Sequence, residues 1–215
     1  MCCMMPAPAL ILGSTSRYRS ELLSRLRIPF VVVAPRVDET PRAGETPVTL
    51  ARRLALSKAR EVAARHPAAV VIGSDQVADL DGQPIGKPGN HERAVEQLRS
   101  MRGRAVVFQT AVAVVCLSSR FERIELAPVT VRFRDLHDDE IEHYLRAEQP
   151  YDCAGSAKCE TLGIALLESI ESDDPTALVG LPLIRTSAML RAVGLDPLAL
   201  RPVAQTSIGT GQESR

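Results

Sequence analysis

Residues 69–72 constrain the fold more than any other stretch of this chain, because all four are apolar. A strand of this composition has to be covered on both of its faces, as in an α/β protein. The run leads directly into Gly73-Ser74-Asp75-Gln76, which we expect at the end of the strand. With 215 residues and 45% hydrophobic content, the chain is long enough to build a sizeable core around it.

Short apolar runs alternate with helical patterns along the first half of the chain. Strands are predicted at 9–12, 30–34, 69–72, 106–117, 124–133 and 164–167. Helices are predicted at 21–26, 47–66 (with Thr46 as N-cap), 92–101, 138–147 and 182–193, and Asp81-Gly82 indicates a hairpin turn. Because the later strands follow one another, the prediction is an α/β fold with a mixed twisted sheet flanked by helices.

Composition argues against several classes of function. Lys plus Arg and Asp plus Glu both number 26, so no long nucleic acid is expected as a partner. Neither a membrane-spanning run nor the charge order of a signal peptide is found, which predicts a cytoplasmic protein with no membrane association. The five cysteines form no C-x-x-C pair and have no histidine at zinc-ligand spacing, which predicts reduced thiols.

Two cations lie on apolar helix faces. Lys58 falls within the apolar stripe of the long helix, which is formed by Ala51, Leu54, Ala55, Ala59 and Val62. Its ammonium either extends past the edge of the core to water or binds an internal anion.

Arg19 repeats this arrangement in the first turn of the first helix, where it shares a side with Leu22 and Leu23. Two inward cations, one of them at a helix N-terminus, favour a polyphosphate pocket. The preceding turn, 13–16, lacks the Gly-Lys-Ser/Thr ending of a Walker A loop, and alone it is typical of an N-cap.

Glu39 and Asp75 supply the acidic side chains of the predicted site. Asp75 follows an apolar strand and needs a partner, whereas Glu39 lies on a polar loop, as does the solvated Asp38. Two carboxylates beside triphosphate oxygens can hold Mg²⁺ or Mn²⁺, and one of them can accept a proton from water. Lys87 either returns towards the same pocket or is an ordinary solvated lysine.

Together these residues resemble the Maf family, whose pattern is a strand followed by Ser-x-Ser-Pro-Arg-Arg and a Glu-Leu-Leu helix. Residues 14–23 carry this pattern, with Arg17 in place of the usual Pro and Tyr18 in place of the first usual Arg. The resemblance covers residues 10–198. It continues through Val37-Asp38-Glu39-Thr40, Ala55-x-x-Lys58-Ala59, Gly73-Ser74-Asp75, Gly86-Lys87-Pro88, Gly155-Ser156 and Gly180-Leu181-Pro182.

The resemblance implies a relative of the inosine triphosphate pyrophosphatases: one Maf-like catalytic domain at 10–200, with two lobes around a central cleft, and a homodimer. Residues 1–9 would form an N-terminal extension, and the polar tail at 201–215 is predicted to be disordered. The implied reaction splits a nucleoside triphosphate between its α and β phosphates, with a divalent metal cation as cofactor.

The roles implied by the resemblance fall into two groups. Asp75 would be the general base and would hold the metal together with Glu39, while Lys58 and Lys87 would stabilise phosphate charge. The phosphates would be bound by Ser14, Ser16 and Arg19.

Substrate preference in this family divides at three positions. Here they are Tyr18, Gln76 and Glu160, as in the branch that resembles 7-methyl-GTP pyrophosphatases, whereas the dTTP/UTP branch typically has Arg, Thr and Gln. Methylation makes the guanine cationic, which favours an aromatic face and a nearby carboxylate. The resemblance therefore implies conversion of 7-methyl-GTP to 7-methyl-GMP and diphosphate, clearing a modified nucleotide. The alternatives are a dTTP/UTP pyrophosphatase and a non-catalytic nucleotide-binding regulator of cell division.

Overall fold

A mixed seven-stranded sheet forms the centre of the computed structural model, which describes residues 8–199. The strand order is β2-β1-β3-β5-β6-β7, and β4 pairs with β3. β1 runs parallel to β2 and β3, and the other pairs are antiparallel. The strands are β1 (Leu10–Gly13), β2 (Phe30–Val32), β3 (Val70–Leu80), β4 (Gln83–Ile85), β5 (Ala105–Cys116), β6 (Phe121–Phe133) and β7 (Leu167–Glu171).

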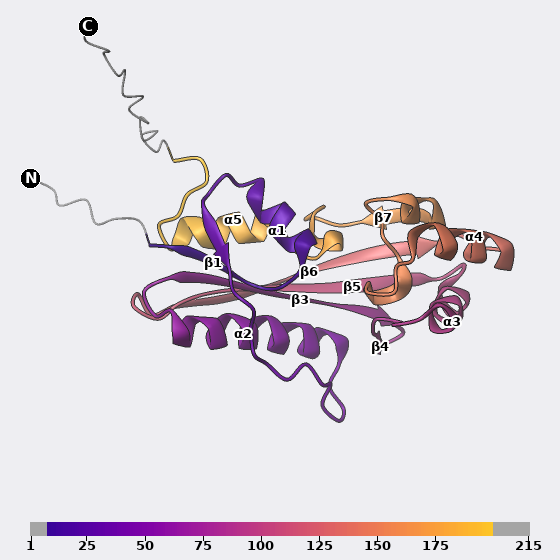
Figure 1. Cartoon of the computed structure of the whole chain (residues 1–215), viewed down its shortest axis with the longest axis horizontal. Coiled ribbons are helices and arrows are strands. Elements are labelled where there is room, and N and C mark those ends of the chain that lie inside the picture. Colours follow the sequence, from indigo (N-terminus) through magenta and orange to yellow (C-terminus); the bar gives the residue numbers. More distant parts are fainter. Residues whose placement is uncertain (1–7, 200–215) are drawn as a thin grey trace, which may run out of the picture.

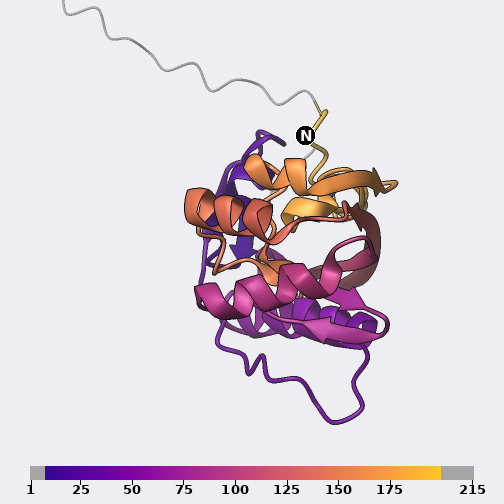
Figure 2. The same cartoon turned by 90° about the vertical axis from the view of Figure 1, so that its right-hand side faces the viewer.

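Helices cover both faces of this sheet, which confirms the predicted fold class. α2 lies on one face and α1 and α5 on the other, while α3 and α4 pack at the far end of the sheet (Figure 1). Figure 2 looks onto that end and shows α3 and α4 in front of the sheet. The helices are α1 (Arg17–Ser24), α2 (Pro47–Arg65), α3 (His91–Met101), α4 (Asp138–Glu148) and α5 (Leu183–Ala192), with short 3₁₀ helices η1 (Ala154–Ser156), η2 (Leu162–Leu166) and η3 (Ala177–Val179).

The alternation of side chains along β3 explains its uniformly apolar beginning. Val71 packs against the apolar side of α2, whereas Val70 and Ile72 pack with residues of α1 and α5 on the opposite face. All three are fully buried, so the strand is covered on both faces as expected.

The expectation that β3 ends before Gly73 is wrong. Its parallel pairing with β1 does stop at the Gly13 and Gly73 pair. Antiparallel pairing with β5 continues as far as Asp79, however, so the strand runs on. Asp75 therefore lies within β3 but two residues past the last pair that β3 forms with β1.

Gly73 allows α2 to lie directly against β3. A Cβ atom at this position would be 2.3 Å from the carbonyl oxygen of Ala55 and 2.6 Å from the backbone nitrogen of Ala59. We expect Gly73→Ala to lower the free energy of unfolding by about 3 kcal/mol, because helix backbone has to move. Urea denaturation measures this change. Gly86→Ala is the control, since a Cβ atom there would have no neighbour within 4 Å; equal stabilities of the two variants would contradict the expectation.

Two further local predictions have opposite outcomes. The hairpin at Asp81-Gly82 is confirmed, with φ angles of 53° and 81° between β3 and β4. The strand predicted at 164–167 is wrong, since 162–166 form η2 and β7 begins only at Leu167. Gly163 packs so closely on the backbone of Lys158 that a Cβ atom would lie 2.5 Å from its carbonyl oxygen, and the chain turns there.

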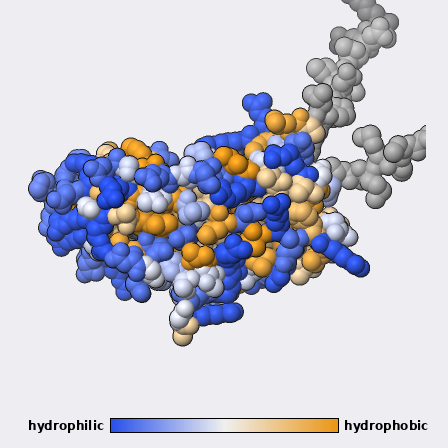
Figure 3. All heavy atoms as spheres, turned by 180° about the vertical axis from the view of Figure 1, so that it is seen from behind, coloured by the Kyte–Doolittle hydropathy of each residue, from blue (hydrophilic) through white to orange (hydrophobic). Residues whose placement is uncertain are grey.

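The end of the molecule formed by α3 and α4 has its own apolar cluster. Leu98 and Met101 of α3 and Ile141 and Leu145 of α4 are fully buried in it. Polar side chains cover the outer surface of this end, on the left in Figure 3. None of the helices within 8–199 has the length and apolar character needed to cross a membrane.

Some sequence predictions concern residues that the structure does not describe. The tail at 201–215 and most of the extension at 1–9 lie outside the described residues, as do Cys2 and Cys3. Cys116, Cys153 and Cys159 are described and are free thiols, as expected.

Candidate active site

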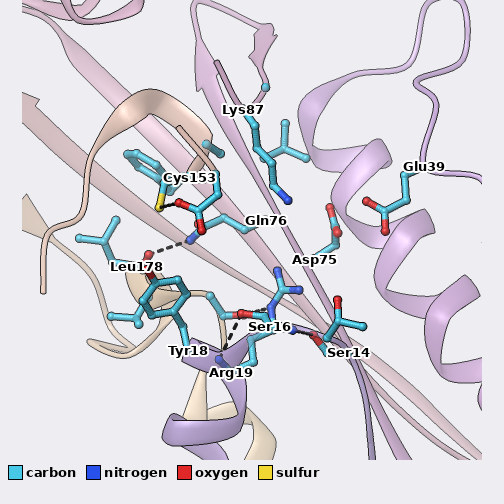
Figure 4. A pocket seen from close by; sticks show the side chains of 18 of the residues that line it. Ser14, Ser16, Tyr18, Arg19, Glu39, Asp75, Gln76, Lys87, Cys153 and Leu178 are labelled. Carbon is cyan, nitrogen blue, oxygen red and sulfur yellow. Dashed lines mark hydrogen bonds between the residues drawn. The ribbon is translucent and has the colours of Figure 1, made fainter. Parts of the chain in front are cut away.

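A cavity of about 740 Å³ opens at the point where β1 ends. Its walls come from the turn after β1, from β3, from the loop that follows β4 and from segments near 152–160 and 178–180. All ten predicted site residues line it: Ser14, Ser16, Tyr18, Arg19, Glu39, Lys58, Asp75, Gln76, Lys87 and Glu160. Figure 4 shows that Ser14, Arg19, Asp75 and Lys87 point towards one region of it, and that Tyr18 and Gln76 lie in another.

The buried ammonium of Lys58 lies between two carboxylates. Its Nζ is 2.6 Å from Oδ1 of Asp75 and 2.8 Å from Oε1 of Glu39. Lys58 and Asp75 are buried, whereas the Glu39 side chain is 58% exposed. Of the two interpretations of Lys58, the internal ion pair is therefore the one observed, with carboxylates as its anions. The one ammonium and the two carboxylates together give this cluster one net negative charge.

Gln76 faces away from Asp75, because neighbouring residues of a strand point to opposite faces. Its Nε2 atom lies 2.9 Å from Oγ1 of Thr110 and 3.0 Å from the carbonyl oxygens of Ala177 and Leu178. These protein acceptors engage the two amide hydrogens, so Oε1 is the polar atom that Gln76 can offer to a ligand.

Ser14 and Ser16 organise the start of α1. Ser16 is the N-cap, and its Oγ accepts from the backbone nitrogen of Arg19 at 3.4 Å. Oγ of Ser14 accepts from the backbone nitrogen of Ser16 at 3.1 Å. Both hydroxyls act as acceptors here, so each can donate its own proton to an anion. The helix N-terminus adds partial positive charge at the same place.

The carbonyl oxygen of Gly180 holds Arg19 in place. It accepts from Nε of Arg19 at 2.9 Å and from Oγ of the buried Ser74 at 2.8 Å. The guanidinium therefore keeps its terminal nitrogens for the cavity. Burial lowers the pKa of Arg19 from its ordinary value, while the carboxylates of Asp75 and Glu39 act in the opposite direction.

Gly180 has a φ angle of 113°, and a Cβ atom there would lie 3.4 Å from Nε of Arg19. In the sequence this glycine was noted only as part of the Gly180-Leu181-Pro182 motif of the family resemblance. Its contact with Arg19 joins residues 161 positions apart, which no local pattern reveals.

Aromatic and charged side chains form the other end of the cavity. The guanidinium carbon of Arg17 lies 4.8 Å from the ring centroid of Tyr18, and Nη2 of Arg17 donates to the Tyr18 hydroxyl at 3.0 Å. One face of the Tyr18 ring is thus already stacked on a cation. Glu160 lines this end together with Asp152, so two carboxylates are available there.

Sequence reasoning missed three residues of this end. Arg17 was noted only as a departure from the family pattern, and Asp152 and Cys153 lie on a loop without periodicity. Burial raises the pKa of Cys153 to about 12, so its thiol remains protonated and is a poor nucleophile.

Glu39 and Asp75 are the carboxylates that could hold a divalent cation. Residues 8–199 contain no group of three or more His, Cys, Asp or Glu that could bind a metal ion. Carboxylate oxygens suit Mg²⁺ and Mn²⁺, which complete their coordination with water and phosphate oxygens in many nucleotide sites. The donor set therefore fits a metal that is shared with a phosphate ligand.

The fold and the cavity define an α/β protein whose cleft joins a helix N-terminus to a cluster of buried charges. The family model described as "Maf-like protein" matches residues 9–193, and the chain belongs to this family. It is 73% identical over 192 residues to a protein named 7-methyl-GTP pyrophosphatase from Polaromonas sp. (strain JS666), covering 89% of this chain and 88% of that protein.

A protein of the same name from Bordetella pertussis is 60% identical over 200 residues, covering 92% of this chain and 100% of that protein. Among solved structures, a HAM1 protein from Coxiella burnetii aligns with a TM-score of 0.43 at 16% identity, over 60% of this chain and 74% of that chain.

Proposed function

We propose that this protein hydrolyses 7-methyl-GTP to 7-methyl-GMP and diphosphate within a single catalytic domain at 10–200. The proposal is supported by relatives of that name at 60% and 73% identity. The observation that carries it is the buried pair of Lys58 and Asp75 at 2.6 Å, on the wall of a cavity that also receives the N-terminus of α1. Such a site sets a proton acceptor beside a place for phosphate.

The reaction is a displacement at the α phosphorus. A water oxygen forms the new P–O bond while the bond to the oxygen bridging to the β phosphorus breaks, and that oxygen leaves with diphosphate. Asp75 accepts the proton of the attacking water, and Lys58 orients its carboxylate through the 2.6 Å contact. Arg19 and Lys87 offset the negative charge that develops on the phosphate oxygens.

The phosphates are bound at the start of α1. The hydroxyls of Ser14 and Ser16 and the free backbone N–H groups of the first turn donate hydrogen bonds to phosphate oxygens. Glu39 and Asp75 would hold the divalent cation, which would supply positive charge that polarises the phosphate. Lys58 and the metal would then share the same two carboxylates, and the two positive charges would repel each other. The negative charge of the substrate would offset this repulsion and help to bind the metal.

The methylated base is recognised by charge at the far end of the cavity. Tyr18 offers the face of its ring that Arg17 does not cover to the cationic base, and Glu160 attracts the base. We expect Glu160→Gln to lower the ratio of kcat/KM for 7-methyl-GTP to that for GTP by about tenfold, because one attractive charge is lost. Glu168→Gln is the control, since Glu168 is exposed and outside the cavity. An unchanged ratio in Glu160→Gln would remove Glu160 from base recognition.

Release of diphosphate from a nucleotide panel tests the function itself. The panel contains 7-methyl-GTP, GTP, dTTP and UTP, each with Mg²⁺, with Mn²⁺ and with a chelator. We expect the highest kcat/KM for 7-methyl-GTP and loss of activity with the chelator. Equal rates on GTP and 7-methyl-GTP would refute the proposed specificity, and a preference for dTTP or UTP would point to the other branch. Tight nucleotide binding without any release would favour a regulator.

Besides the metal, the domain bounds and the residue roles proposed above, three expectations from the sequence stay predictions. They are the cytoplasmic location, the homodimer and the absence of long nucleic acid as a partner. Light scattering in solution would test the homodimer directly.

A further inference from the structure

Gln97, on α3, connects two walls of the cavity through the two ends of its side-chain amide. Its Nε2 donates to the carbonyl oxygen of Gly86 at 3.1 Å. Its Oε1 accepts from the hydroxyl of Ser156 at 2.6 Å. Gln97 and Ser156 are not among the residues that line the cavity, so any effect they have on a ligand is transmitted through their neighbours.

The first of these contacts is made to the loop that carries Lys87. Gly86 directly precedes Lys87, and both line the cavity. On the other side of the lysine, the backbone nitrogen of Gly89 donates to the carbonyl oxygen of Tyr151 at 3.0 Å. Lys87 therefore lies between two backbone hydrogen bonds, one at Gly86 and one at Gly89. Gln97 makes the bond at Gly86.

The second contact is made to the segment that forms the wall at the base end. Ser156 is fully buried and has a φ angle of 54°, a conformation that is uncommon for a residue other than glycine. It lies between Cys153 and Glu160, which both line the cavity. The hydroxyl of Ser156 donates to Gln97 at 2.6 Å from this turn, and Ala157 and Glu160, which follow it, line the cavity.

We propose that Gln97 is a positioning residue that sets the distance between Lys87, at the phosphate end, and the wall at 153–160, at the base end. This inference rests on the proposed function for its consequence. A bound nucleoside triphosphate spans both ends of the cavity. Because the side-chain amide of Gln97 bonds to both walls, it sets their separation to the length of this ligand. A catalytic group displaced by about 1 Å can cost up to about a hundredfold in rate.

Three variants separate the two arms of this bridge. Gln97→Ala removes both contacts. Gln97→Glu keeps an acceptor for Ser156 but loses the donor to Gly86, and Ser156→Ala does the reverse. Glu96→Gln is the matched control, because Glu96 is exposed on the neighbouring position of α3 and outside the cavity.

Two readouts are measured for each variant: hydrogen exchange in peptides covering 85–89 and 153–160, and kcat and KM for 7-methyl-GTP and GTP. We expect faster exchange in both peptides for Gln97→Ala. Gln97→Glu should affect only 85–89 and lower kcat about tenfold with the base preference kept. Ser156→Ala should affect mainly 153–160 and reduce the preference for 7-methyl-GTP.

Wild-type exchange in both peptides of Gln97→Ala would overturn the inference, as would the same loss of kcat and of base preference in all three variants. Faster exchange over the whole chain in Gln97→Ala, with no difference between Gln97→Glu and Ser156→Ala, would make Gln97 a general stability residue and also overturn it. If the wild-type protein released no diphosphate from any nucleotide, the proposed function would fail, while the exchange data would still decide whether Gln97 joins the two walls.

Discussion

Asp75→Asn should lower kcat for diphosphate release from 7-methyl-GTP by about a thousandfold, with a much smaller change in KM. An amide cannot take the proton of the attacking water, and a general base contributes rate factors of about this size. The amide oxygen can still accept a hydrogen bond from Lys58, which is 2.6 Å from Oδ1 of Asp75 in this structure. Steady-state kinetics with Mg²⁺ and with Mn²⁺ measure the effect.

Asp79→Asn is the matched control for this variant. Asp79 lies four residues further along β3, on the same face, and its Oδ1 accepts from the backbone nitrogen of Gly82 at 2.8 Å. An asparagine keeps that bond, and Asp79 does not line the cavity. Wild-type turnover by Asp75→Asn, measured at equal folded fraction, would rule out Asp75 as the base.

Lys58→Met should lower the free energy of unfolding by about 3 kcal/mol in the absence of nucleotide, and should also impair turnover. The variant leaves the buried Asp75 without its counter-charge, which is the costly half of a broken buried ion pair. The contact with Glu39 adds little to this estimate, because Glu39 is largely exposed and solvent screens its charge.

The double variant Lys58→Met with Asp75→Asn tests this explanation. Removing the unpaired charge should restore part of the lost stability, so the two changes should not be additive. Arg60→Met, two residues further along α2, breaks an exposed pair with Glu122 and should change stability by less than about 1 kcal/mol. Urea denaturation of the four variants gives the comparison. A Lys58→Met protein as stable as the Arg60→Met protein would contradict the role of Lys58 as counter-ion.

The parts of the fold that the sequence predicted are those with strong local patterns. The apolar start of β3 and the stripe of α2 indicated their burial, and the hairpin at Asp81-Gly82 follows from residues that accept positive φ. The end of β3 could not be predicted in this way. It depends on pairing with β5, in which Asp75 lies opposite Ala111 and Gln76 opposite Thr110, residues that are distant in the sequence.

The candidate site shows the same division. Lys58 was visible in the sequence as a charge on an apolar face, and Asp75 as a carboxylate after an apolar run, because both are unusual in their local surroundings. Gln97 gave no such signal, since a glutamine on a helix surface is ordinary. Its two hydrogen bonds are to Gly86 and Ser156, and only the tertiary structure brings these residues close to it.

The alternation of side chains between the two faces of β3 bears on how related enzymes can diverge after gene duplication. Asp75 points to the face of α2, and Gln76 points to the opposite face, where it contacts Ala177 and Leu178. A mutation at Gln76 can therefore remodel one side of the sheet without disturbing the ion pair on the other. Neighbouring positions of one strand can thus vary independently, because each side chain contacts a different layer of the molecule.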